Sequence, residues 1–199
     1  MKKVLYILLG LVALVLIAAV VIPIVYKDKI VAMVKDEANK SLNAKLEFSD
    51  LDISLLRHFP NLTVSMTNLS IANNSPFEGD TLISGKEISA TVNLMSVISG
   101  SQIDIRSILL DQPRINLIVL KDGKANWDIS KPDSSKAEAS EPSKFKIGLK
   151  KYAINNGDIR YNDESMGFSS HLENMTHTGS GDFTQDLFTL STETNVEKF

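Results

Sequence analysis

Apolar and polar residues alternate along most of the chain. Between Leu62 and Met66, the apolar residues Leu62, Val64 and Met66 are separated by single polar residues. Successive side chains of a β-strand point to opposite faces of a sheet, so this pattern predicts a strand with one apolar and one polar face. The apolar positions resume at Leu69 and Ile71 after one shifted step, and the same alternation returns many times downstream.

Short strands separated by turn-forming residues make up the body of the predicted fold. The stretches 59–61, 73–76, 99–101 and 111–113 contain Pro, Gly, Asn or Ser and interrupt the apolar runs, as turns do. Strands at this spacing favour an antiparallel meander over a parallel α/β sheet. We therefore expect a mainly β fold, an antiparallel β-meander with turns at these four breaks.

The turn after Val119 sets the register of one predicted hairpin. A two-residue loop would put the apolar residues before and after the turn on opposite faces of the hairpin. A three-residue loop at 121–123 instead pairs Val119 with Ala125 and Leu117 with Trp127, which keeps one face apolar. It also places the glycine of the loop at the left-handed position that such loops require. We predict the three-residue loop.

The sequence YAINNGDIRY, residues 152–161, predicts a second hairpin. A two-residue turn of Asn156 and Gly157 pairs Ile154 with Ile159 and keeps both on one face. Asn-Gly between alternating apolar residues is the strongest short-range hairpin signal, because both turn residues need a positive φ. The alternation then continues, more weakly, towards the C-terminus.

The segment Val4–Tyr26 contains no charged residue. As a helix it would be about 34 Å long, enough to cross a hydrocarbon core about 30 Å thick. A cleaved signal peptide is the alternative, with an apolar core of about 7–15 residues followed by small residues at the cleavage site. Bulky residues occupy 22–26 here, so we predict an uncleaved transmembrane helix. Lys2, Lys3 and the amino terminus, against two lysines after the segment, give only a slight bias towards a cytoplasmic N-terminus.

A short amphipathic helix is predicted at Asp28–Asn43. Charged residues fall elsewhere, and one stripe of the helix carries the apolar residues Ile30, Val31, Val34, Ala38 and Leu42. Two interpretations fit this pattern: a stalk that continues from the anchor, or a helix that binds a partner. It is the one amphipathic helix that the sequence offers to cover the apolar faces of the strands.

The stretch Ser130–Lys144 has no apolar residue larger than Ala and is rich in Ser, Pro, Lys and Glu, which predicts a disordered linker. The alternation continues to the last residue, Phe199, without a closing element, so we expect the chain to be the front part of a longer protein. The expected divisions are an anchor at 1–26, a juxtamembrane helix at 27–45, a first part of the sheet at 46–129, the linker at 130–144 and a continuation of the sheet at 145–199.

Composition and motifs argue against several classes of function. The net charge is −3 without a Lys/Arg cluster, so no nucleic-acid partner is expected. The chain has no cysteine, which excludes disulfides, thiolate metal sites and a Cys nucleophile. His58, His171 and His177 lack the spacing of a shared metal site, and no nucleophile elbow, phosphate loop or zinc motif is present. We expect no enzyme activity, no cofactor and no metal.

The order of several motifs resembles that of a known family. A lysine-led apolar helix and a short helix precede LEFSDLDISLLRHFPNLTVSMTNLSIAN, and DGKANWDI and YAINNGDIRYND follow. This order is similar to the amino-terminal region of the AsmA family of Gram-negative envelope proteins, in the version with a His-Phe-Pro and a Gly-x-x-Asn-Trp-Asp signature. The resemblance covers nearly the whole chain, although family members are generally much longer. It implies a bacterial inner-membrane anchor, a cytoplasmic N-terminus and a periplasmic body.

The resemblance also implies a function. The family is similar in architecture to chorein-type bridge proteins, whose long curved sheet forms an open apolar groove. It is linked to outer-membrane assembly, through phospholipid movement across the periplasm and effects on the targeting of outer-membrane proteins. The partners implied are phospholipid acyl chains, the inner membrane and other envelope proteins. The candidate lipid-groove residues are Leu62, Val64, Met66, Ile88, Val92, Leu94, Ile103, Ile105, Ile115, Leu117, Val119 and Trp127.

A second interpretation fits the same alternation. The sheet folds over on itself as an ordinary sandwich, so that its own residues cover the apolar faces. The protein is then an anchored periplasmic scaffold that binds other envelope proteins and carries no lipid. Periodicity alone does not distinguish a lipid-facing strand from a packed one.

Overall fold

The fold is mainly β, as predicted, with helical segments at the margins of one sheet. The structure is a computed structural model that describes residues 38–99, 103–131, 145–146, 148–185 and 187–199, together with 6, 17, 21, 27–28, 31–32 and 34–36. Its elements are β1 (Ala44–Glu47), β2 (Asp50–His58), β3 (Asn61–Asn73), β4 (Thr81–Asn93), α2 (Leu94–Ile98), β5 (Ile103–Asp111), β6 (Arg114–Val119), β7 (Phe145–Lys146), β8 (Lys151–Asp163), β9 (Phe168–Ser180) and β10 (Ser191–Asn195).

Most of the predicted anchor, Val4–Tyr26, lies outside the described residues, which include only Tyr6, Ile17 and Val21 of that segment. A search of the described residues finds no helix with the length and apolar character needed to cross a membrane. The anchor therefore stays a prediction from the sequence. Most of the predicted linker lies outside the described residues as well, since 132–144 are not among them.

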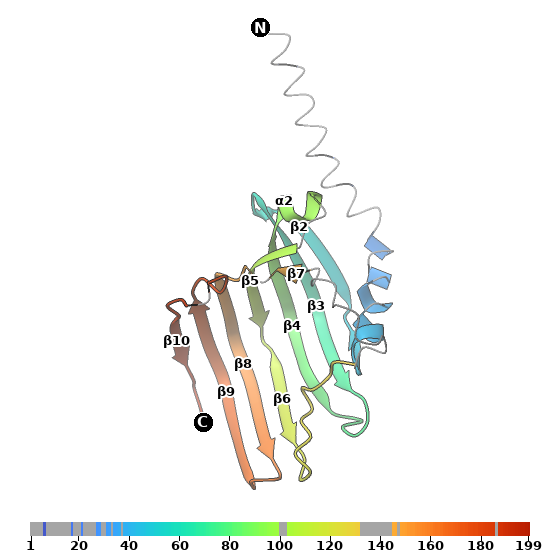
Figure 1. The fold of residues 1–199 in the computed structure, drawn as a ribbon, viewed down its shortest axis with the longest axis vertical. Coiled ribbons are helices and arrows are strands. Elements are labelled where there is room, and N and C mark those ends of the chain that lie inside the picture. The colour runs from blue at the N-terminus through green and yellow to red at the C-terminus, as the bar shows by residue number, and fades with distance from the viewer. Residues whose placement is uncertain are drawn as a thin grey trace.

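Ten strands form one sheet in the order β1–β3–β4–β5–β8–β9–β10, with β2 beside β3, β6 between β4 and β8, and β7 beside β5 (Figure 1). Most neighbours are antiparallel, but β5 is parallel to β7 and β8, and β6 is parallel to β8. The predicted antiparallel meander is wrong at this point. The chain does not turn back at 111–113, so β5 and β6 lie end to end and run in one direction, and β8 begins beside the start of that line.

A line of left-handed residues crosses the sheet. The residues are Asn68 in β3, Gln112 between β5 and β6, Asn156 in β8 and Asn174 in β9, with φ values of 51°, 49°, 52° and 52°. At this level, successive positions on one face are three residues apart instead of two in β3, β4, β8, β9 and the line of β5 and β6, as happens where a strand contains an extra residue. The steps are Met66–Leu69, Gly85–Ile88, Leu110–Pro113, Ile154–Gly157 and Leu172–Met175. Because neighbouring strands share the step, the apolar positions stay aligned.

The predicted Asn-Gly hairpin is wrong. β8 runs without reversal from Lys151 to Asp163 and pairs with β5 and β6 on one side and with β9 on the other. The left-handed conformation of Asn156 bends the strand and does not reverse it. Gly157 follows on the crowded side of the bend, where an added Cβ would lie 2.9 Å from Cγ2 of Ile154, well inside the optimal separation of about 3.5–4.0 Å between carbon atoms.

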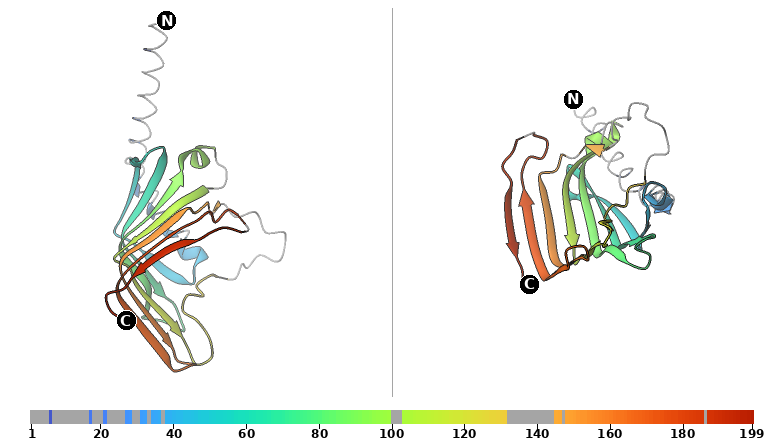
Figure 2. Two further views of the ribbon diagram at one scale, coloured as in Figure 1. Left: turned by 90° about the vertical axis from the view of Figure 1, so that its left-hand side faces the viewer. Right: turned by 60° about the horizontal axis from the view of Figure 1, so that its bottom comes forward.

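The sheet bends strongly, and the helical residues 38–41 lie on the inside of the bend (Figure 2). The described residues of the predicted amphipathic helix are helical up to residue 41, whereas Leu42 forms a bridge with Ser130 and Asn43 lies beyond the helix. Three of them, Val31, Val34 and Ala38, pack against the core cluster of Leu46, Phe48, Leu51 and Leu69. Lys35 fixes the helix to the sheet, because its Nζ donates to the main-chain oxygen of Phe48 at 2.8 Å and lies 4.5 Å from the centre of that ring. The helix therefore covers part of the apolar face of its own sheet.

The predicted three-residue loop after β6 is confirmed. Val119 bridges to Ala125, the amide of Leu120 donates to the oxygen of Lys124 at 2.9 Å, and Gly123 has a φ of 81°. The further pairing of Leu117 with Trp127 is not formed. The chain turns after Ala125, where the amide of Asp128 donates to the oxygen of Ala125 at 3.2 Å, so Trp127 leaves the line of the strand.

Candidate functional site

Apolar rows run across the inner face of the sheet, which we define as the face on the inside of the bend. Cross-strand partners lie on the same face, so the register identifies the members of each row. One row is Leu51, Met66, Ile88, Leu110 and Ile154, and a second row, on the other side of the bend, is Leu46, Ile71, Ile83, Ile115, Ile159 and Leu172. The inner-face residues of both rows are therefore apolar as far as β8; on β9 the second row ends at Leu172, but the first row ends at His177, the partner of Ile154.

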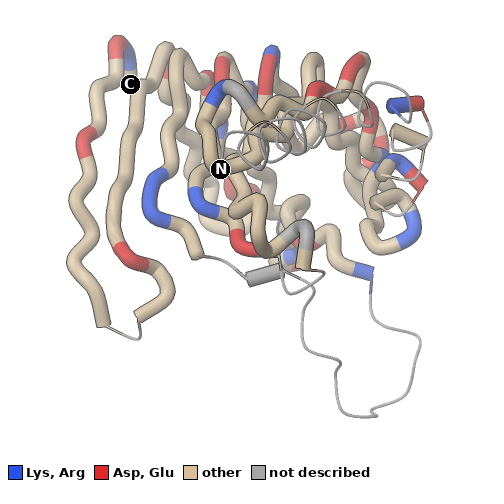
Figure 3. Tube along the Cα trace, turned by 90° about the horizontal axis from the view of Figure 1, so that it is seen from above, with Lys and Arg blue, Asp and Glu red and all other residues tan. Residues whose placement is uncertain are grey.

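The outer face of the same strands is polar. The row next to the bend is Asp50, Thr67, Glu87, Asp111 and Asn155, and the following row is Asp52, Ser65, Ser89, Leu109 and Ala153, which is polar except on β5 and β8. Charged residues of both signs are spread around the curved sheet (Figure 3). The apolar residues of these strands therefore gather on the inner face and are not spread evenly over both faces of the sheet.

The helix covers only one part of the inner face. The cluster beneath it extends to Ile83 and Ile88 of β4, and among the described residues it includes none from β5, β6 or β8. On those three strands, the inner-face residues Leu110, Ile115 and Ile154 are half-buried and lie outside that cluster. The apolar surface over β5, β6 and β8, which lies outside the cluster beneath the helix and which we call the inner groove, is the candidate functional site.

The structure places the predicted candidates in three groups. Val64, Met66 and Ile88 pack against the core cluster, and Leu62 pairs with Val92 near the upper end of the sheet in Figure 1. Val92 is 7% exposed, so it belongs to the packed part of the sheet and not to the inner groove. Leu94 is the first residue of α2 and is half-buried.

The remaining candidates lie on or beside the inner groove. Ile105 pairs with Val92, and Ile115, Leu117 and Val119 are alternate, half-buried residues of β6. Ile103 begins β5, and its side chain lies outside the described ones. Trp127 lies on the segment that follows β6 and is 44% exposed.

Four residues of the inner groove are not among the predicted candidates. Ile108, Leu110, Ile154 and Ile159 lie on the inner face of β5 and β8. Ile108 and Leu110 follow the period-two pattern and carry the same signal as the residues chosen. Ile154 and Ile159 were assigned to a hairpin, and only the register reveals that they face β5 and β6.

Aromatic rings line the lower end of the inner groove, the end formed by the turn between β8 and β9. The Tyr161 ring lies 6.3 Å from that of Trp127 and 6.1 Å from that of Phe168, centre to centre. Its hydroxyl donates to Asp163 at 3.0 Å, which raises the pKa of Tyr161. Hydrogen bonds from the Ser165 side chain, the Met166 amide and the Tyr161 hydroxyl lower the pKa of Asp163. The Asp163 carboxylate therefore stays charged and orients the Tyr161 ring.

The segment 120–131, which we call the strap, joins β6 to the end of the helix. Asn126, at 1% exposure, fixes its middle: Oδ1 accepts from the Ile118 amide at 2.9 Å, and Nδ2 donates to the Asn116 oxygen at 2.7 Å. Asn73 of β3 donates to the main-chain oxygen of Asn126 at 2.7 Å. The asparagine of the Gly-x-x-Asn-Trp-Asp signature thus links β6 to the end of β3 through hydrogen bonds.

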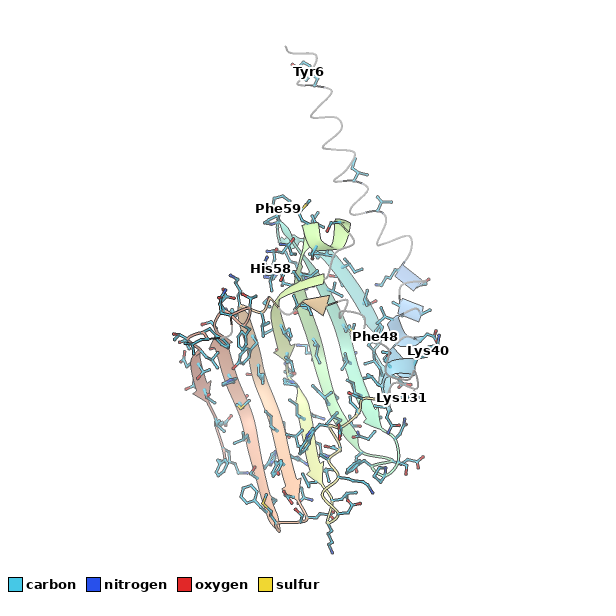
Figure 4. The ribbon with its side chains drawn as sticks, viewed as in Figure 1. Tyr6, Lys40, Phe48, His58, Phe59 and Lys131 are labelled. Carbon is cyan, nitrogen blue, oxygen red and sulfur yellow. The ribbon has the colours of Figure 1, made fainter. Side chains whose placement is uncertain are left out.

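The far end of the strap is tied to the helix. The Asn43 amide donates to the Ile129 oxygen at 2.6 Å, and Lys131 Nζ donates to the Asn39 oxygen at 2.8 Å. Figure 4 labels Lys131 beside the helix end that carries Lys40. Helix and strap therefore border the inner groove on the side of β1 to β3.

The three histidines are held by neighbouring side chains. His58 Nδ1 lies 2.8 Å from Thr63 Oγ1, and His177 Nε2 lies 3.1 Å from the Tyr152 hydroxyl. His171 lies on the outer face, with Nε2 at 3.0 Å from Asp158. In the part of the chain that the structure describes, no group of three His, Asp or Glu side chains is placed to hold a metal ion.

Comparison with known proteins gives one match. The family model described as AsmA family matches residues 1–183. No curated protein and no solved structure matches the chain.

Proposed function

Because the chain belongs to the AsmA family of envelope-associated proteins, we propose that it is an inner-membrane-anchored periplasmic protein that moves phospholipid through its inner groove during outer-membrane biogenesis. The anchor is the uncharged segment Val4–Tyr26 and the body is the bent sheet. The acyl chains lie on the inner face while the polar head group faces solvent. An effect on the targeting of proteins to the outer membrane follows from the lipid supply.

The uncovered apolar rows of β5, β6 and β8 carry this proposal. Burial of apolar surface gains about 25 cal/mol per Å² whether protein or lipid covers it. An acyl chain of about 16 methylenes gains of the order of 10 kcal/mol on full transfer from water, at about 0.8 kcal/mol each, before entropy costs. A groove that works in this way binds by contact area and needs no catalytic residue.

Native mass spectrometry of the full chain, extracted in a mild detergent, tests the proposal. Phospholipid that stays bound after the detergent is removed in the gas phase is the expected result. A protein that carries no lipid and is monomeric would contradict it and would favour the scaffold interpretation, in which other envelope proteins are the partners.

A further inference from the structure

Two large apolar side chains are exposed together at the upper end of the sheet. Phe59, in the turn between β2 and β3, is 67% exposed, and Met95, in α2, is 66% exposed. The two segments are neighbours, because Asn61 at the start of β3 pairs with Asn93, which directly precedes α2. Phe59 is also the middle residue of the His-Phe-Pro signature, which lies outside the inner groove.

Hydrogen bonds order the two segments that carry these side chains. His58 Nδ1 bonds to Thr63 across the β2–β3 turn. Oδ1 of Asn93 accepts from the amides of Met95 and Ser96 at 2.9 and 3.3 Å and caps the start of α2. The exposure of Phe59 and Met95 is therefore built into two ordered turns, and it exposes apolar surface that would be more stable out of water.

Tyr6, a described residue of the predicted anchor, lies beyond this same end. Figure 4 shows Tyr6 beyond the end of the sheet that carries His58 and Phe59. Tyr6, Ile17 and Val21 are 69%, 60% and 46% exposed, and all three belong to the uncharged segment Val4–Tyr26. Phenylalanine and other large apolar side chains of interfacial segments bury themselves at the boundary between the lipid head groups and the acyl chains.

We propose that Phe59 and Met95 insert into the lipid surface beside the anchor, so that the upper end of the inner groove rests on the bilayer. The inference uses the anchor of the proposed function but not its lipid cargo. The contact is apolar, because Arg57 beside the turn already pairs with Glu87 at 3.3 Å and Asp52 at 3.6 Å. Neutral and anionic lipids are therefore bound alike.

Single cysteines test the insertion directly, because the chain has no cysteine of its own. The full chain is reconstituted in phosphatidylcholine bilayers as Phe59→Cys, Met95→Cys or Asp122→Cys, each labelled with an environment-sensitive fluorophore. Asp122 lies in the loop after β6, at the opposite end of the sheet, and is the matched control. Lipids with a nitroxide near the head group should quench the labels at 59 and 95 and leave the label at 122 bright.

Quenching at both positions with a bright label at 122 supports the proposal, and any other pattern overturns it. A blue-shifted label that nitroxide lipids do not quench would mean that protein, not lipid, covers this end. Circular dichroism confirms that each labelled variant keeps the sheet. The quenching does not depend on phospholipid bound in the inner groove. A protein that carries no lipid but has quenched labels would therefore contradict only the proposed lipid transport and not the insertion of Phe59 and Met95.

Discussion

The Ile115→Asp variant of the full chain is expected to lose most of its bound phospholipid. Ile115 lies at the middle of the inner groove, between Ile83 of β4 and Ile159 of β8. A carboxylate here is hydrated in the empty groove, since the side chain is half-buried, but acyl chains would strip its water. Burying an unpaired carboxylate costs well over the 1.4 kcal/mol that corresponds to a tenfold change in affinity. Native mass spectrometry should show at least about tenfold less lipid.

The next residue provides the control. Asn116 faces the opposite side of β6, where it pairs with Arg160, so Asn116→Asp adds the same charge to the same strand on the polar face. This variant should retain lipid at the wild-type level. Equal loss from both variants would point to a disturbed strand, and equal retention would mean that acyl chains do not occupy the inner groove.

The Asn126→Leu variant is expected to lower the free energy of unfolding by about 3 kcal/mol, the upper part of the range for a buried polar group left without its partner. Leucine has the same branched arrangement of side-chain heavy atoms as asparagine, but it leaves the Ile118 amide, the Asn116 oxygen and the side chain of Asn73 without the bonds that Asn126 provides. The chain has one tryptophan, Trp127, so urea unfolding in mild detergent can be followed by its fluorescence.

Asn74→Leu is the matched control for this second prediction. Asn74 belongs to the same corner of the sheet but is exposed and makes one side-chain bond, to Asn43 at 3.3 Å. The change in the free energy of unfolding should stay within about 0.5 kcal/mol, as for other surface substitutions. If the two variants unfold alike, Asn126 does not stabilise the strap.

The sequence predicts the strands well and their connections poorly, for a physical reason. Alternation reports which face a side chain occupies, so Met66, Ile88 and Ile115 were assigned correctly to apolar positions. Asn156-Gly157 carries the chemistry of a positive φ, and both a hairpin and a bend within a strand use it. The shifted step at Leu69 recurs at Pro113, Gly157 and Met175, and the register of the strands shows that these steps lie side by side as one bend line and are not a set of turns.

The sequence predicts which face of the strands is apolar, but it does not predict which part of that face forms the site. Which part of an apolar face stays uncovered depends on where the helix packs, and Val31, Val34 and Ala38 carry no local signal for β1 to β4 as their partner. Val92 illustrates the consequence: its position in the alternation matches that of Ile105, yet it is 7% exposed and belongs to the packed part of the sheet. The parallel pairing of β8 with β6 also has no signal in the sequence, because the paired residues lie far apart along the chain.

Photo-cross-linking at Leu109 and Leu110 in cells tests the central claim most directly. These adjacent leucines of β5 face opposite sides of the sheet, since Leu109 pairs with Ser89 and Leu110 with Ile88. A photoreactive residue at 110 should form covalent adducts with phospholipid, and the same residue at 109 should not. Adducts at 109 as abundant as those at 110, or adducts at 110 with protein alone, would contradict a lipid-filled inner groove.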